Sequence, residues 1–249
     1  MKNKKFTFAD VTFELELPHG VTLKNGLDDF VSDREADYLI RVLLTDGESF
    51  PSKTVERNRN VITRYVHQKH GKELNTASLL ATSEAAFLFP EHDAFILHAS
   101  YILYDGRAIL FTAPSGTGKS TQARFWSEER GAEIVNGDRV LVTKRNGCFY
   151  ANGIYACGTS GICKNITAPI AAVVFLEQGE CNMRNDIPAR LLFLRILCEC
   201  SDNMSDTVQY EKITELVSDM INTVPTVCYR CQKSPVAVSA LERILWNRE

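Results

Sequence analysis

The chain has 249 residues, of which 45% are hydrophobic and 24% charged, a composition typical of a globular protein with a sizeable core. Its formal net charge of −3 gives no reason to expect a nucleic-acid or membrane partner. The basic segment 1–5 is not followed by the apolar run of a secretory signal, and no stretch approaches the ~20 apolar residues of a membrane span. We therefore expect a cytoplasmic protein.

The first third of the chain has the pattern of β-strands. Residues 6–17, 38–45 and 61–67 alternate apolar and polar side chains, which is the period of a half-buried strand. No long helical period precedes residue 113. We expect a mostly β N-terminal region over residues 1–90, packed on a core that comprises residues 91–249.

A strong hairpin signal follows. The apolar runs Ala94–Tyr104 and Arg107–Thr112 are separated by Asp105-Gly106, a dipeptide typical of tight β-turns. The second strand would enter the next loop from an antiparallel partner, so the sequence predicts a mixed sheet. Further strands are expected at residues 140–143, 148–150 and 170–176, the first two as a hairpin and the last as a buried central strand.

Helical periodicity dominates the C-terminal part of the chain. After a helix over Ser120–Arg130, Pro188 is expected at the first position of a helix that buries Leu191, Leu194 and Cys198. Two more helices have core positions with helical spacing: Ile213, Leu216, Val217 and Met220, then, after Ser234-Pro235, Val238, Leu241, Ile244 and Leu245.

All eight cysteines lie between Cys148 and Cys231. Some, such as Cys157 with Cys163, have spacings that resemble metal half-sites. The pairs nevertheless fall on segments with helix or strand patterns, whereas zinc ligands usually lie in short loops. We expect free thiols in a reducing cytoplasm.

Residues Ala113–Thr121 read APSGTGKST and match the P-loop pattern G-x-x-x-x-G-K-[ST], except that Ala113 replaces the first glycine. Glycines allow the backbone torsions and close approach that form a nest of N–H groups for phosphate at a helix N-terminus. Lys119 would reach the β- and γ-phosphates, and the Ser120 hydroxyl would bind Mg²⁺. The sequence therefore predicts binding of ATP with Mg²⁺ by Ala113, Pro114, Ser115, Gly116, Thr117, Gly118, Lys119, Ser120 and Thr121.

Two further residues are candidates for this site. A P-loop needs an acid that shares the metal, normally at the end of a neighbouring strand, and Asp138 follows such a strand end. It would act as metal ligand or base; the alternative is an ordinary turn residue. His98 lies in the strand expected to pair with the P-loop strand, so it is a candidate catalytic residue. A lone strand histidine is more often a core or surface residue.

Together these motifs resemble HPr kinase/phosphorylase and its small relatives. The resemblance rests on Leu97–Ser100, the Asp-Gly turn, the P-loop and Asn136–Arg139, and residues 173–182 (VVFLEQGECN) are similar to the small relatives. ATP-dependent phosphoenolpyruvate carboxykinase shares this P-loop fold, but the chain is too short to be that enzyme. The resemblance covers residues 94–180, weakly the C-terminal helices and only loosely residues 1–90. It implies an α/β fold with a mixed β-sheet, a mostly β N-terminal region and C-terminal helices.

The resemblance also implies roles for the site residues. Lys119 would hold the phosphates, Ser120 and Asp138 would hold Mg²⁺, and His98 would take the place of the family's active-site histidine. Family members typically have two adjacent acids where this chain has Gly137-Asp138 or Asp138-Arg139. One carboxylate would then serve both the metal and the acceptor hydroxyl, and the base stays open between Asp138 and His98.

The sequence thus predicts an ATP- and Mg-dependent kinase that phosphorylates a serine hydroxyl on a small protein or a ribosomally made peptide. The family's phosphorylase signature is missing, which favours a plain kinase. Two alternatives remain: a nucleotide-gated binding module, which the missing second acid favours, and a small-metabolite kinase. The glycine-rich segment 152–161 would shape an acceptor pocket or form a flexible surface loop. The acceptor, ATP against GTP preference and the oligomeric state, a homo-oligomer included, stay open.

Overall fold

The computed structural model describes residues 3–24, 27–46, 53–67, 73–200 and 207–246. The chain divides into two compact units, Met1–Leu88 and Phe89–Glu249. Each unit has its own main sheet. Within the described residues, no helix combines the length and apolar character needed to cross a membrane.

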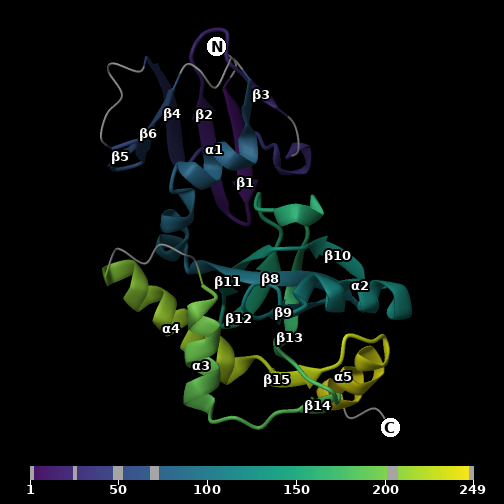
Figure 1. The fold of residues 1–249 in the computed structure, drawn as a ribbon. Coiled ribbons are helices and arrows are strands. Elements are labelled where there is room, and N and C mark those ends of the chain that lie inside the picture. Colours follow the sequence, from purple (N-terminus) through teal and green to yellow (C-terminus); the bar gives the residue numbers. More distant parts are fainter. Residues whose placement is uncertain (1–2, 25–26, 47–52, 68–72, 201–206, 247–249) are drawn as a thin grey trace. The chain divides into compact units, whose positions relative to one another are not determined.

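The first unit contains a mixed sheet with the strand order β1-β2-β4-β6-β5 (Figure 1). These strands are β1 (Lys4–Phe8), β2 (Val11–Glu16), β4 (Tyr38–Thr45), β6 (Val61–His67) and β5 (Val55–Asn58). A short parallel pair and a helix complete the unit: β3 (Thr22–Lys24), β7 (Glu73–Asn75) and α1 (Thr76–Thr82). The strands predicted at 38–45 and 61–67 are confirmed, and the first third of the chain is mostly β as expected.

The single strand predicted over residues 6–17 is wrong, because the segment forms the antiparallel hairpin of β1 and β2. Ala9 adopts a left-handed conformation with φ of 54° at the turn. The sequence contains the signal for this turn. Buried apolar residues occupy even positions before it (Phe6, Phe8) and odd positions after it (Val11, Phe13). Such a change of phase marks the place where the chain reverses.

The second unit is built on a mixed sheet. Its strands are β8 (Ala94–Tyr104), β9 (Arg107–Thr112), β10 (Glu133–Asn136), β11 (Arg139–Arg145), β12 (Cys148–Asn152), β13 (Thr167–Gln178), β14 (Met183–Arg184) and β15 (Thr226–Cys231). The pairings form a closed circuit from β8 through β11, β12, β13 and β9 back to β8. Strands β8 and β9 are antiparallel, whereas β9 is parallel to β13 and β13 to β15. Both predicted hairpins and the mixed sheet are confirmed.

Helices pack on both faces of this sheet (Figure 1). They are α2 (Lys119–Arg130) and α5 (Val236–Trp246) on one face, and α3 (Ala189–Cys198) and α4 (Thr207–Thr223) on the other. A hydrophobic core lies on each face of the sheet, and strand β9 contributes to both. Leu110 joins the core under α3 and α4, whereas Ile109 and Phe111 join the core under α2 and α5. Because a strand alternates its side chains between two faces, both faces of β9 are buried from Ala108 to Thr112, which fixes the start of the loop that follows.

Two of the predicted helix faces are confirmed. The four core positions predicted for α4 are buried. In α5 Val238 and Leu241 are buried, and Ile244 and Leu245 are partly buried against the same core. For α3 the predicted face is wrong. Leu191 and Leu194 are 39% and 46% exposed, whereas Leu192 and Ile196 are buried. Because almost every residue of this helix is apolar, its sequence permits more than one core face, and only packing in the folded protein selects one.

Candidate active site

The predicted P-loop connects β9 to α2. Gly116 and Gly118 have φ angles of 80° and 122°, a region that side chains disfavour. A Cβ atom added at either glycine would meet no atom within 4 Å, so the loop surrounds open space. The loop lies at the N-terminus of α2, where free N–H groups favour an anion. These features fit a bound phosphate chain.

Ala113, at the first glycine position of the motif, is fully buried in the core under α2 and α5. Its methyl group therefore packs inward, which explains how the loop tolerates this substitution.

Lys119 is also buried, with 7% of its surface exposed. Its Nζ donates hydrogen bonds to the carbonyl oxygens of Ala113, at 2.7 Å, and Pro114, at 3.3 Å. Burial lowers the pKa of Lys119. An anionic phosphate beside Nζ would oppose this effect.

The second predicted metal ligand lies next to Ser120. The Ser120 hydroxyl donates to the carbonyl oxygen of Gly137 at 3.2 Å, and Asp138 is the next residue. Asn136 shapes this turn, because its Oδ1 accepts the N–H groups of Asp138, at 3.0 Å, and Arg139, at 3.1 Å. A hydroxyl and a carboxylate are the oxygen donors that Mg²⁺ prefers. Among the described residues no cluster of three or more His, Cys, Asp or Glu could hold a metal. Mg²⁺ here would therefore take its remaining oxygens from phosphates and water.

His98 lies beside Asp138. In the antiparallel pair of β8 and β11, His98 is opposite Arg139, and its Nε2 lies 3.6 Å from Asp138 Oδ1. The interaction with Asp138, and then that with Glu199, raises the pKa of His98. His98 in turn lowers the pKa of Asp138. The structure thus brings Asp138 and His98 together with the P-loop serine.

Glu199 is the site residue that sequence reasoning missed. It follows α3 directly, and its Oε2 lies 3.0 Å from His98 Nδ1. Its backbone carbonyl also accepts the His98 N–H at 2.8 Å. A second carboxylate therefore lies beside His98, while the role of Asp138 toward both the metal and the acceptor hydroxyl stays a prediction. The second acid comes from a segment 101 residues away, where no local spacing points to the site. Asp138 has no acid beside it in sequence, and Arg139 Nε lies 3.7 Å from its Oδ2.

The glycine-rich segment 152–161 packs against the Asp138 turn. Gly158 has φ of 57°, and a Cβ atom there would lie 2.6 Å from Asp138 Cβ. Gly137 is similarly close to Ser160, since its added Cβ would lie 2.3 Å from Ser160 Oγ. The segment therefore shapes the candidate site and is not only a surface loop.

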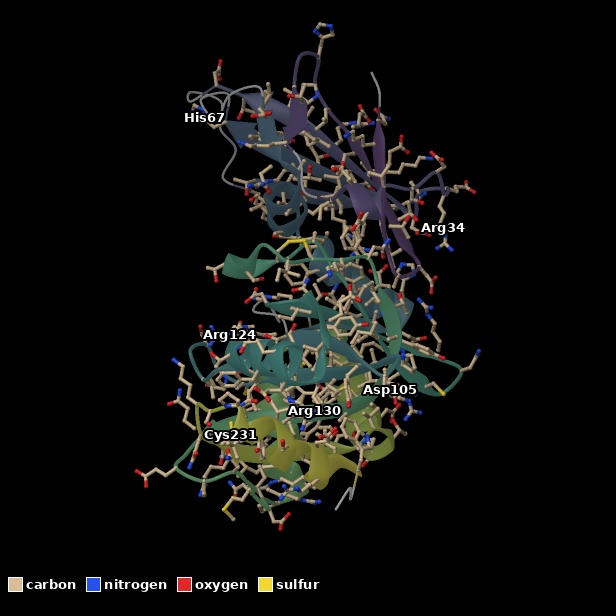
Figure 2. All side chains as sticks on the ribbon, turned by 90° about the vertical axis from the view of Figure 1, so that its right-hand side faces the viewer. Arg34, His67, Asp105, Arg124, Arg130 and Cys231 are labelled. Atoms are coloured by element: carbon tan, nitrogen blue, oxygen red, sulfur yellow. A yellow bond between two sulfur atoms is a disulfide. The ribbon has the colours of Figure 1, made fainter. Side chains whose placement is uncertain are left out.

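A disulfide between Cys157 and Cys163 closes this segment (Figure 2). The expectation that these two cysteines are free thiols is wrong. The turn at 158–160 followed by Gly161, which has φ of 66°, brings the two Cα atoms to 5.2 Å, within the range of a disulfide. The remaining cysteines are free: Cys148, Cys181, Cys198, Cys200, Cys228 and Cys231.

Within the described residues, two cavities adjoin the P-loop at the carboxyl ends of the parallel strands β9, β13 and β15. One has a volume of about 300 Å³ and includes Gly118, Thr121 and, from the end of β15, Cys231, which Figure 2 labels. The other has a volume of about 580 Å³ and includes Ser115, Glu177 and Arg195. Crevices at this edge of α/β sheets commonly bind ligands.

Comparisons with known proteins add little. No family model matches the chain, and no curated protein sequence matches it either. Among solved structures, the chain is similar to the HPr(Ser) kinase/phosphatase from Coxiella burnetii, with 15% identity over 60% of this chain and 94% of that one. The TM-score is 0.32, which is too low to define a fold or a function. Functional conclusions therefore depend on the residues of the site.

Proposed function

We propose that this chain is an ATP- and Mg-dependent kinase that transfers the γ-phosphate to a serine hydroxyl of a small protein or a ribosomally made peptide. One observation carries the proposal: three separate segments bring the P-loop, Asp138 and His98 to one place. The Ser120 hydroxyl donates a hydrogen bond to the carbonyl oxygen of the residue before Asp138. Asp138 Oδ1 lies 3.6 Å from His98 Nε2. A glycine-rich turn that merely caps a helix would not need these partners.

The binding roles follow from the chemistry of the side chains. Lys119 and the N–H groups of the loop would hold the phosphates. Ser120 and Asp138 would hold Mg²⁺, which would neutralise the negative charge that the attacking hydroxyl must approach. The Ser120 hydroxyl donates its proton to Gly137, so its oxygen lone pairs stay available for a cation.

In the transfer step the acceptor hydroxyl oxygen forms a bond to the γ-phosphorus. The bond from that phosphorus to the β,γ-bridging oxygen breaks, and ADP leaves with the electron pair. The hydroxyl proton passes to the Asp138 carboxylate or to a neutral His98 Nε2.

The serine acceptor is proposed on the resemblance to HPr kinase. An acceptor would enter beside His98 and Asp138, while the cavities along the P-loop offer room for the nucleoside and for the rest of the acceptor. The same site would serve a small-metabolite kinase, which differs only in the acceptor.

The test is to incubate the purified chain with Mg-ATP and peptides from a host lysate, and to identify by mass spectrometry which molecules gain a phosphate. Asp138→Asn protein, processed in parallel, controls for contaminating kinases. We expect serine phosphopeptides that depend on the wild-type chain. Phosphorylation of small metabolites alone would support the metabolite kinase. Tight binding of Mg-ATP without any phosphorylated acceptor would favour the nucleotide-gated binding module.

A further inference from the structure

The imidazole ring of His98 is held from the side opposite Asp138. Its Nδ1 lies 3.0 Å from Glu199 Oε2, and its Nε2 lies 3.6 Å from Asp138 Oδ1. We propose that Glu199 is a positioning residue for phosphate transfer: it accepts the Nδ1–H of His98 and thereby holds Nε2 toward Asp138. The role depends on the proposed kinase function, since it specifies how that site is assembled.

The backbone that carries Glu199 is held by several contacts. Glu199 is the C-cap of α3, and its own N–H donates to the carbonyl oxygen of Ile196 at 3.0 Å. The next residue, Cys200, is buried and forms an isolated β-bridge with Leu97. The His98 N–H donates to the Glu199 carbonyl. Backbone contacts at Glu199 and at Cys200 therefore fix where the Glu199 side chain begins.

Because the backbone contacts already join α3 to β8, the Glu199 side chain is not needed to hold the helix in place. Only 11% of that side chain is exposed, against 20% for His98. Placing a charged carboxylate in a largely buried position carries a desolvation cost, which the hydrogen bond to Nδ1 offsets. The clearest consequence of the interaction is the orientation of the ring.

Orientation matters because the two ring nitrogens are not equivalent. A carboxylate that accepts one N–H sets which nitrogen faces the reaction, as in catalytic histidines of hydrolases. Without Glu199 the ring could rotate, and Nε2 would leave Asp138. Glu199 does not touch the reacting atoms, so its loss should slow turnover without weakening nucleotide binding.

Three variants separate this role from a charge effect. Glu199→Gln keeps the length and an acceptor oxygen but removes the charge. Glu199→Asp keeps the charge but is one methylene too short to reach Nδ1. Glu199→Ala removes both. Glu211→Ala, at an exposed position on α4, controls for the loss of an unrelated glutamate. The readouts are kcat and KM for consumption of Mg-ATP, measured with the acceptor that the mass-spectrometric screen identifies and with water alone.

We expect kcat to fall about 10- to 100-fold in Glu199→Ala and Glu199→Asp, the size of effect typical of residues that orient a functional histidine. KM for Mg-ATP should stay within about twofold, and Glu199→Gln should retain most of the wild-type kcat. Unchanged kcat in Glu199→Ala would overturn the proposal. Equal losses of kcat in Glu199→Gln and Glu199→Ala would overturn it too. So would a loss of kcat in Glu199→Gln with full activity in Glu199→Asp, since both results implicate the charge of Glu199.

A second measurement does not depend on turnover. In protein labelled with ¹⁵N-histidine, the Nδ1–H proton of His98 should be protected from exchange in the wild type and in Glu199→Gln. This protection should be lost in Glu199→Asp, which is the less disruptive variant if Glu199→Ala fails to fold. An unprotected proton in the wild type contradicts the hydrogen bond. A protected proton in a chain that never consumes Mg-ATP would refute the kinase function, and the positioning role with it, while leaving the hydrogen bond intact.

Discussion

The Ser120 hydroxyl donates a hydrogen bond to the carbonyl oxygen of Gly137 over 3.2 Å, and Asp138 follows in the chain. Ser100 donates to the same oxygen at 2.9 Å. A carbonyl oxygen has two lone pairs, so both are used. The start of α2 is thereby joined to the turn between β10 and β11. A ligand that orders the P-loop should consequently also order Asp138.

The first prediction concerns nucleotide binding. In Lys119→Ala the loop loses its one cation directed at the β- and γ-phosphates. A charge-assisted hydrogen bond contributes ~1.5–3 kcal/mol, so the affinity for Mg-ATP should fall about 10- to 100-fold. Isothermal titration calorimetry measures this change. Arg124→Ala removes an exposed cation on the same helix, labelled in Figure 2, and should bind as the wild type does. Equal affinity of Lys119→Ala and wild type would contradict the P-loop assignment.

The second prediction concerns turnover. Asp138→Asn keeps the shape of the side chain but removes the charge that would stabilise the transition state. At saturating ATP, acceptor phosphorylation should fall about 10²- to 10³-fold, whereas ATP affinity should change less. Asp105→Asn, in the exposed hairpin turn, is the matched control. A larger loss in His98→Ala than in Asp138→Asn would assign the base to His98, and full activity in Asp138→Asn would exclude a catalytic role for Asp138.

Local sequence signals predicted much of the second unit. The hairpin of β8 and β9 follows from a turn dipeptide, and the core face of α4 follows from its helical period. The loop between β9 and α2 follows from its glycines, since Gly116 and Gly118 both adopt positive φ angles there. Each of these signals lies within about 20 residues of chain, so no knowledge of the tertiary structure was needed.

Features that depend on tertiary contacts could not be predicted in the same way. Glu199 meets His98 only because α3 ends beside β8, and the two residues are 101 positions apart. The core face of α3 depends on which of its many apolar residues the sheet accepts. The disulfide depends on a turn whose geometry comes from two left-handed glycines, Gly158 and Gly161. The alternation in residues 6–17 did contain a usable signal, namely its change of phase.

The third prediction concerns pH. His98 has a raised pKa, so its pairing stabilises the fold fully below the ordinary histidine value of about 6.5, and this contribution is lost as the pH rises through the raised pKa. Asp138 has a lowered pKa, so its contribution is present above about 3.9 and is lost as the pH falls through the lowered pKa. The free energy of unfolding should therefore differ most between wild type and His98→Gln from about pH 4 to pH 6.5.

Urea unfolding followed by tryptophan fluorescence measures this difference. Both tryptophans, Trp126 and Trp246, lie in the second unit, so the signal reports on the unit that contains the pair. His92→Gln, at an exposed position in the same unit, is the control. A difference between wild type and His98→Gln that stays constant from acidic to alkaline pH would show that the ion pair does not form.

The last prediction tests the packing of segment 152–161 on the Asp138 turn. Gly158 and Gly161 have nearly equal left-handed torsions, with φ of 57° and 66°. Alanine at either position should therefore cost about 1–2 kcal/mol in backbone strain.

The two glycines differ in their surroundings. A Cβ atom at Gly158 would lie 2.6 Å from Asp138 Cβ, whereas one at Gly161 would meet nothing within 4 Å. Because a shift of about 1 Å in a catalytic group can cost about 10²-fold in rate, Gly158→Ala should lose about that much turnover while Gly161→Ala loses little. Acceptor phosphorylation and thermal unfolding of both variants give the comparison. Equal turnover in two equally destabilised variants would mean that the segment does not hold Asp138 in place.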